Sequence, residues 1–225
     1  MKNGARKQLG QPRKGVWIWI LLAIVLSLVA SCALAVRQAY KVDESLPIGT
    51  IQGDFFIGQR FPFKVKIPSG WQGDTKYPEF LVEQGYGREG LKETPFFLFN
   101  SRTKSSIQFD FSPAGRTARF DQEIIEYLVR SSGKSLVTEV HEEHGKSAPI
   151  QLSKVTPVQL KGIPYAARMS AQLVIKGERR EQGWIYAFAE PYQIFILYLI
   201  TGQNRDADKE ALRQALSSFE YLWVH

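Results

Sequence analysis

The sequence predicts an α+β domain, an antiparallel β-sheet meander flanked by helices, which is preceded by one N-terminal transmembrane helix. Three observations lead to this prediction. Residues 16–36 form an apolar run of 21 residues without a charge. Several later segments alternate apolar and polar residues, the pattern of half-buried strands, whereas two others repeat apolar residues at helical spacing. The chain therefore divides into a basic tail over 1–15, the membrane segment, a linker over 37–54 and a folded domain over 55–225.

The apolar run has the length and the flanks of a membrane-spanning helix. About 20 apolar residues cross the hydrocarbon core of a bilayer as a helix. Trp17 and Trp19 lie at its N-terminal end, where indole rings favour the membrane interface. The basic tail before the run predicts a cytoplasmic N-terminus. The C-terminal domain is then expected outside the cytoplasm, in a periplasm, at the cell surface or in a lumen.

Three processing outcomes compete for this segment. An uncleaved single-pass anchor is favoured, because the run is longer than the apolar core of about 7–15 residues found in signal peptides. Cleavage after Ala35 would follow the small-x-small pattern of Ala33-Leu34-Ala35. A lipoprotein would be modified at Cys32, because Val29-Ala30-Ser31-Cys32 resembles the bacterial lipobox. All three outcomes place the domain beyond the cytoplasmic membrane, and Cys32 is the only cysteine, so the domain has no disulfide.

The first half of the domain predicts three principal strands. Residues 61–67 alternate apolar side chains with two lysines, which indicates a strand with one buried face. Residues 72–94 are rich in glycine and proline and are expected to be irregular, with a short strand near 80–82. The segments 96–99 and 106–111 predict a hairpin.

A helix is predicted to follow. One helical face is formed by Phe120, Ile124, Ile125, Leu128 and Val129. We expect this helix to stop at Gly133 and the residues 136–140 to be extended.

The C-terminal half predicts a meander and a final helix. Short polar or Gly/Pro-containing connections separate four strand candidates, 155–160, 165–175, 184–189 and 193–201. The last strand is apolar on both faces and so requires cover on both sides. Asp206 is the expected cap of the final helix, whose buried stripe is formed by Ala211, Leu212, Ala215, Leu216 and Phe219.

The net charge of +7 does not indicate nucleic-acid binding. Lys2, Arg6, Lys7, Arg13 and Lys14 supply five units of it in the first 36 residues, without an acidic residue. The other 189 residues carry 24 basic and 22 acidic side chains, too even a balance for a phosphate-binding surface. The densest basic cluster is Lys176, Arg179 and Arg180, which acidic neighbours interrupt, and a solvated turn is its favoured interpretation.

The sequence contains one weak candidate for a metal site. His141 and His144 are three residues apart, whereas zinc proteases place two histidines four apart on a helix. If the preceding residues are extended, these two side chains point to opposite faces and do not chelate, whereas a helical turn would bring them together. Zinc also needs a third protein ligand. We therefore assign no metal, cofactor or catalytic residue, and we expect no enzyme activity.

The aromatic side chains offer one further candidate. A ligand groove would be lined by Trp71, Trp184, Tyr186, Tyr192 and Tyr198. Packing in the core or on the sheet is the favoured interpretation of these residues.

The order of elements resembles the PsbP/Mog1-like fold, which includes the PsbP-like and DcrB-like proteins of bacteria. Three segments carry the resemblance: Ile67-Pro68-Ser69-Gly70-Trp71, Val158-Gln159-Leu160-Lys161-Gly162-Ile163-Pro164-Tyr165 and Leu216-Ser217-Ser218-Phe219. It covers about residues 55–222 and implies an α/β/α sandwich. It also implies a non-catalytic accessory, assembly or binding module, as its photosynthetic members support photosystem II. No site residue is transferred.

The sequence thus predicts a membrane-anchored accessory module that binds a protein partner at the membrane surface and binds no nucleic acid. The alternative is a periplasmic protein that binds a metal or a small ligand, with His141 and His144 contributing. A hydrolase with an unrecognised site ranks last.

Overall fold

The computed structural model describes residues 42–89, 94–114, 120–175, 177–202 and 204–222, which belong to one compact unit. Within these ranges, no helix has both the length and the apolar character needed to cross a membrane. The apolar run 16–36 lies outside them, so the membrane anchor, Cys32 and the cleavage site after Ala35 stay predictions.

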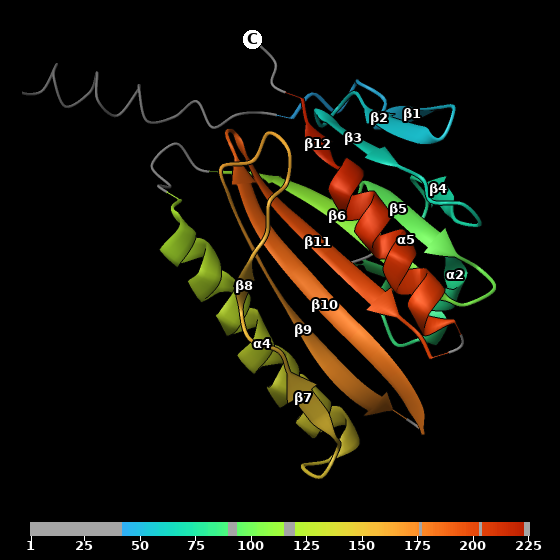
Figure 1. The fold of residues 1–225 in the computed structure, drawn as a ribbon, viewed down its shortest axis with the longest axis vertical. Helices are drawn as coiled ribbons and strands as arrows, with labels where there is room; N and C mark the ends of the chain where they lie inside the picture. Colours follow the sequence, from blue (N-terminus) through green and yellow to red (C-terminus); the bar gives the residue numbers. More distant parts are fainter. Residues whose placement is uncertain (1–41, 90–93, 115–119, 176, 203, 223–225) are drawn as a thin grey trace, which may run out of the picture. The chain divides into compact units, whose positions relative to one another are not determined.

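A large antiparallel sheet forms the centre of the domain (Figure 1). Its strand order is β4-β5-β6-β11-β10-β9-β7, and β8 also pairs with β9. The strands are β4 (Gln72–Asp74), β5 (Phe96–Asn100), β6 (Ser105–Pro113), β7 (Ile150–Leu152), β8 (Thr156–Pro157), β9 (Tyr165–Ile175), β10 (Glu178–Ala189) and β11 (Tyr192–Ile200). The consecutive strands β9, β10 and β11 pair with one another and are three of the four strands of the predicted meander.

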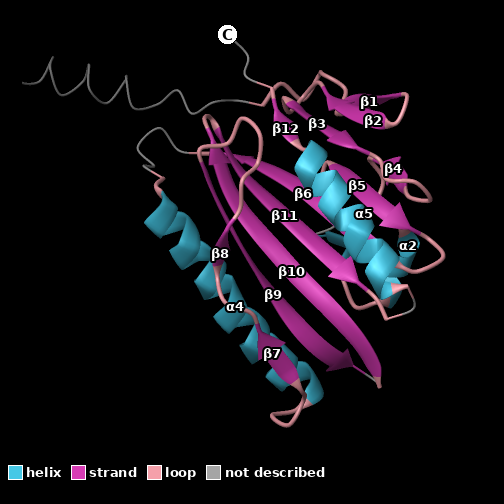
Figure 2. Cartoon of the chain, in the orientation of Figure 1, coloured by secondary structure: helices cyan, strands magenta, loops and turns pink. Residues whose placement is uncertain are grey.

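A small sheet and three helices pack on this centre (Figure 2). The small sheet has the order β1-β2-β3-β12, with β1 (Gly49–Gln52), β2 (Phe55–Gly58), β3 (Phe63–Lys66) and β12 (Glu220–Tyr221). The helices are α2 (Glu79–Glu83), α4 (Gln122–His144) and α5 (Arg205–Ser218). The fold is therefore α+β, as predicted.

The two faces of the large sheet bury different clusters. The face toward α5 and the small sheet is rich in phenylalanine, and Phe109 stacks on Phe219 with ring centroids 5.9 Å apart. The face toward α4 buries Trp184, whose Nε1 donates a hydrogen bond of 2.9 Å to the carbonyl oxygen of Val129. The apolar strand β11 lies between these clusters, which explains its two apolar faces.

The prediction that the middle helix stops at Gly133 is wrong, because α4 continues to His144. The prediction of an extended segment over 136–140 is wrong for the same reason. Gly133 is buried, and a Cβ there would lie 3.0 Å from Sδ of Met169 and 3.3 Å from Cζ2 of Trp184. Glycine at this position therefore lets α4 approach the sheet closely instead of ending the helix.

Four smaller expectations also change. The short strand near 80–82 is instead the helix α2, which buries Leu81. The expected linker 37–54 ends in strand β1, and the strand candidate 155–160 is reduced to β8. Asn204, not Asp206, occupies the N-cap position of α5, without a capping side-chain hydrogen bond.

Candidate functional site: a basic groove on the open face of the sheet

One part of the large sheet is uncovered on the side of α5, and this part forms a groove. Helix α5 contacts β3 and β11, so the same face of β9 and β10 stays open beside it (Figure 1). The opposite wall is the segment 149–156. Two hollows of about 350 and 390 Å³ lie between these walls. We call this surface the basic groove and define it by Lys154, Arg168, Ser170, Gln172, Val174, Arg179, Glu181, Tyr198, Arg205, Lys209 and Arg213.

Cations from four separate segments converge on the basic groove. They are Lys154, Arg168, Arg179, Arg205, Lys209 and Arg213. Among the described residues that line the two hollows, Glu181 is the one carboxylate. Arg213 also pairs with Glu210 on its own helix. Arg168 has no carboxylate partner within the described ranges, and its Nε donates to Oγ1 of Thr156 at 3.4 Å. The groove therefore has excess positive charge.

Glu181 is fixed in the middle of the groove by three donors. Its Oε2 accepts from Nζ of Lys209 at 2.6 Å, from Nε2 of Gln172 at 2.7 Å and from Nη2 of Arg205 at 3.1 Å. Burial raises the pKa of this carboxyl, but the hydrogen bonds from Lys209, Gln172 and Arg205 outweigh burial and lower the pKa below its ordinary value. Glu181 is therefore ionised at neutral pH and joins α5 to β9 and β10.

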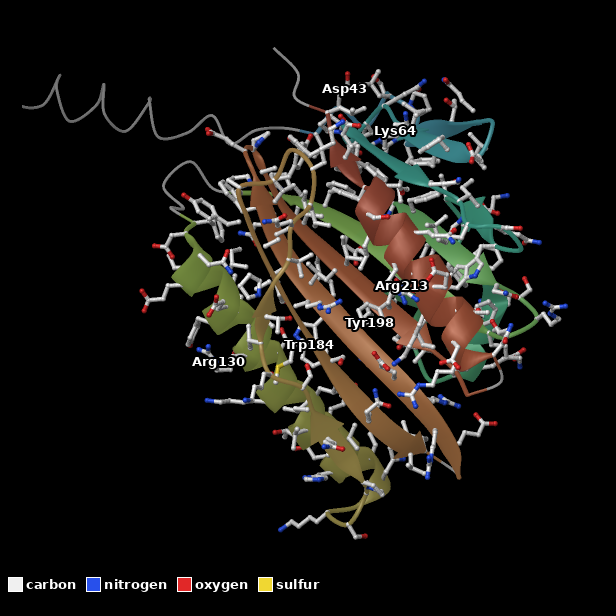
Figure 3. All side chains as sticks on the ribbon, in the orientation of Figure 1. Asp43, Lys64, Arg130, Trp184, Tyr198 and Arg213 are labelled. Atoms are coloured by element: carbon white, nitrogen blue, oxygen red, sulfur yellow. The ribbon has the colours of Figure 1, made fainter. Side chains whose placement is uncertain are left out.

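The floor of the groove includes Tyr198, which is 3% exposed. Its ring fills the space beside Gly183 on the neighbouring strand, where a Cβ would lie only 2.1 Å from Cζ of Tyr198. Burial raises the pKa of this hydroxyl, and the charge of Glu181 raises it further. The hydroxyl therefore keeps its proton at neutral pH. Figure 3 labels Tyr198 and Arg213 on this side of the domain, and Arg130 on α4.

The chemistry of this arrangement is anion binding. Arginine has five N–H donors and lysine has three. Arg205 uses only its Nη2, which donates to Glu181 and to Oε1 of Gln172, and Lys209 uses one N–H on Glu181. The remaining donors are available to carboxylate or phosphate oxygens, with which they make charge-assisted hydrogen bonds.

Comparison with known proteins identifies the fold. No protein-family model matches the sequence, and no curated protein matches it. The solution structure of cyanobacterial PsbP (CyanoP) from Synechocystis sp. PCC 6803 matches 78% of this chain and 99% of its own, with a TM-score of 0.50 and 12% identity. The described chain has the PsbP/Mog1-like fold.

Two further solved structures are similar to this PsbP/Mog1-like domain. LpqN, involved in cell envelope biogenesis of Mycobacterium tuberculosis, has a TM-score of 0.44 at 11% identity, with 71% of this chain and 82% of its own covered. The Saccharomyces cerevisiae Ran-binding protein Mog1p has a TM-score of 0.40 at 11% identity, with coverage of 71% and 90%.

The two histidines lie on the last turns of α4, on the other side of the sheet from the basic groove. Both are therefore helical, contrary to the expectation of an extended segment. Nε2 of His144 lies 3.8 Å from Oε2 of Glu143. Within the described ranges, no group of three or more His, Cys, Asp or Glu side chains is arranged to hold a metal.

The candidate aromatic side chains do not form a groove together. Trp71, Trp184, Tyr192 and Tyr198 are buried, and Tyr186 is half-buried against the α4 cluster. The packing interpretation is therefore confirmed for all five, four in the core and Tyr186 on the sheet.

The basic cluster of the sequence is divided by the strand. Arg179 and Arg180 are adjacent in β10, so they point to opposite faces, and only Arg179 lines the basic groove. The sequence did contain one signal for the groove. Arg205, Lys209 and Arg213 are spaced four residues apart, which places them on one face of α5.

A smaller cavity of about 220 Å³ lies between α2 and α4, on the other face of the sheet. Its apolar wall includes Leu136 and Val140, and its polar wall includes Gln84, Tyr86 and Arg180. Oε1 of Gln84 and Nε of Arg180 are buried without a hydrogen-bond partner in the described structure. Burial raises the pKa of Tyr86.

Proposed function

We propose that this chain is a non-catalytic binding module that is held at the outer surface of a membrane by residues 16–36 and engages a partner protein there. The observation that supports this proposal is the basic groove. It is open to solvent, it is bounded by elements of secondary structure, and its cations greatly outnumber its carboxylates. Surfaces of this kind recruit and orient an oppositely charged partner.

The groove is also better suited to recognition than to stabilising the fold. Of the cations that line it, only Arg205 and Lys209 bind the central Glu181. Arg168 and Arg213 are exposed, and exposed ion pairs contribute little to stability. A surface that gathers six cations around a single carboxylate is more readily explained by binding than by folding.

Photocrosslinking in native membranes tests the proposal. A photoreactive benzoylphenylalanine is introduced into the full-length chain at Val174, which is 36% exposed in the groove. The matched control carries it at Tyr127, which is 64% exposed on α4. We expect a discrete protein adduct from Val174 and none of the same mass from Tyr127. Recovery of uncrosslinked chain alone from both positions would contradict a partner at the groove.

The cavity between α2 and α4 favours a second candidate function, the binding of a small ligand. Its mixed apolar and polar walls and the unpartnered atoms of Gln84 and Arg180 are typical of a ligand pocket. Native mass spectrometry of the full chain purified from its own membranes would detect a bound small molecule. Such a mass should disappear in the variant Arg180→Gln, and its absence from the unmodified protein would argue against this candidate. Calorimetric titration with zinc, repeated on His141→Ala with His144→Ala, tests the metal form of this alternative.

A further inference from the structure

We infer that the basic groove receives an extended segment of the partner in which acidic residues occupy alternate positions. This inference rests on the proposed function and names the chemistry of the partner. The two hollows follow each other along β9, because Arg168 and Ser170 line the first and Gln172 and Val174 line the second. The occupant is therefore elongated.

The spacing of the groove matches an extended chain. Arg205, Lys209 and Arg213 repeat every four residues of α5, which is a rise of about 6 Å per step. In an extended chain, side chains on one face repeat every two residues, at about 6.6–6.8 Å. The accumulated mismatch over three side chains is only about 1–2 Å, which flexible Lys and Arg stems absorb. An acidic residue at every second position can therefore meet each cation of the α5 wall in turn.

The direction of the groove permits this alignment. Figure 1 shows α5 running along β10 and β11 instead of across them. The floor presents Arg168, Ser170, Gln172 and Val174, which are alternate residues of β9 and so share one face. The side chains of the groove floor therefore repeat every two residues, as the side chains on one face of an extended occupant do. Both edges of β9 are already paired, with β10 on one side and with β7 and β8 on the other, so the occupant lies on the face and does not extend the sheet.

Charge selects an acidic segment. Two exposed arginines, Arg168 and Arg213, line the first hollow together with Lys154. Glu181 is already neutralised by Lys209 and Arg205, so it repels an incoming carboxylate less than a free carboxylate would. A basic segment would instead meet like charge along both walls.

The test compares two peptides of identical composition. One twelve-residue peptide alternates Glu and Ser, and the other repeats Glu-Glu-Ser-Ser, so that no two of its six Glu residues are two positions apart and its glutamates on one face repeat only every four residues. Each is labelled with a fluorophore, and its binding to the full-length chain in a non-ionic detergent is measured by fluorescence anisotropy at low and physiological salt. We expect the alternating peptide to bind about three- to tenfold tighter, because only its spacing engages several cations that each contribute modestly. Salt should weaken its binding.

Charge-matched variants locate the site. The double variant Arg168→Ser with Arg213→Ser removes two exposed groove cations, and Arg130→Ser with Lys134→Ser removes two cations from α4. We expect about a fivefold loss or more for the groove variant and no change for the α4 variant. Circular dichroism checks that both variants keep the fold.

Three results would overturn the inference. The first is equal affinity for the two peptides, because it would remove the argument from spacing. The second is equal loss in the groove and α4 variants. The third is an absence of peptide binding while inorganic phosphate or vesicles of phosphatidylglycerol bind in a groove-dependent manner. A protein adduct at Val174 combined with any of these results would leave the proposed function standing and refute only the acidic segment.

Discussion

Replacing Glu181 with glutamine is expected to change stability and partner affinity in opposite directions. Glu181→Gln keeps the shape of the side chain and removes its charge. Two ion pairs are lost, to Lys209 at 2.6 Å and to Arg205 at 3.1 Å. The side chains of these two cations are 37% and 39% exposed, so each pair is discounted for solvent screening to about 0.5–1 kcal/mol. The free energy of unfolding should therefore fall by about 1–2 kcal/mol, which is a decrease in Tm of about 3–6 °C for a domain of this size.

The pH dependence follows from the pKa of Glu181. The native structure lowers that pKa, so the carboxylate stabilises the fold above the pKa of an unfolded glutamate, about 4.3, and this contribution is lost as the pH falls through the lower native pKa. Wild type and Glu181→Gln should therefore differ at pH 7 and converge in acid. Thermal unfolding of the full chain, followed by circular dichroism at both pH values, measures this difference.

The same substitution should strengthen binding. Removing the charge of the central carboxylate raises the positive charge of the groove and releases Arg205 and Lys209 from their ion pairs. The alternating Glu-Ser peptide should bind Glu181→Gln about two- to fivefold tighter than wild type, since the gain is of the order of one exposed ion pair. A stability difference that persists unchanged in acid would refute the electrostatic account of Glu181. Weaker peptide binding by the less stable variant would refute the assignment of the groove as the binding surface.

Three further substitutions test the packing on which the groove depends, each by urea unfolding. Gly183→Ala should lower the free energy of unfolding by about 2 kcal/mol or more, because its Cβ would overlap the ring of Tyr198. This loss should vanish in a Tyr198→Ala background, and additive effects of the two substitutions would contradict the contact. Asp208→Ala should lower the free energy of unfolding by about 1–3 kcal/mol, because this buried carboxylate accepts a hydrogen bond of 2.7 Å from the buried Ser105. The control Asp206→Ala, at an exposed position of the same helix, should change it by less than about 0.5 kcal/mol. Trp184→Phe should cost about 1–2 kcal/mol through the lost hydrogen bond to α4, and an unchanged unfolding midpoint would show that this bond is not needed to hold the helix.

The elements that the sequence predicted well are those whose pattern and environment agree. The strand over 165–175 has the bounds that its alternation predicts, because one of its faces is buried by α4. The buried stripe of α5 is also confirmed, from Ala211 to Phe219. In both elements the apolar residues repeat with one spacing, and that spacing correctly predicts the one face that is buried.

The errors occur where a local rule competes with a contact made by distant residues. Glycine is typical of the end of a helix, and so Gly133 suggested one. In the structure, the close contact with Met169 and Trp184 requires a glycine within the helix. The prediction of an extended segment after Gly133 is wrong because this segment continues the helix. Leu136 and Val140 lie on the same buried face of α4 as Val129.

The basic groove could not be predicted from local composition. Its cations are separated by as many as 59 positions, from Lys154 to Arg213, and they meet only because β9 pairs with β10 and α5 packs beside them. Acidic residues interrupt the one basic cluster that the sequence shows in the domain, Lys176, Arg179 and Arg180. The alternation of a strand then removes Arg180 from the groove while keeping Arg179, so counting charges along the chain misjudges the surface.

The placement of the basic groove and α4 on opposite sides of the sheet gives the domain an electric dipole. Helix α4 carries the glutamates Glu123, Glu126, Glu139, Glu142 and Glu143 against two cations, Arg130 and Lys134. A nearly neutral domain of this kind experiences little net pull in the field of a charged complex but does experience a torque, which turns the groove toward negative potential before contact. This pre-orientation acts only within a few Debye lengths, each about 8 Å at physiological ionic strength. A tether that confines the domain near a membrane would hold it within that range, so ionic strength should alter the rate of its association more than the lifetime of the complex.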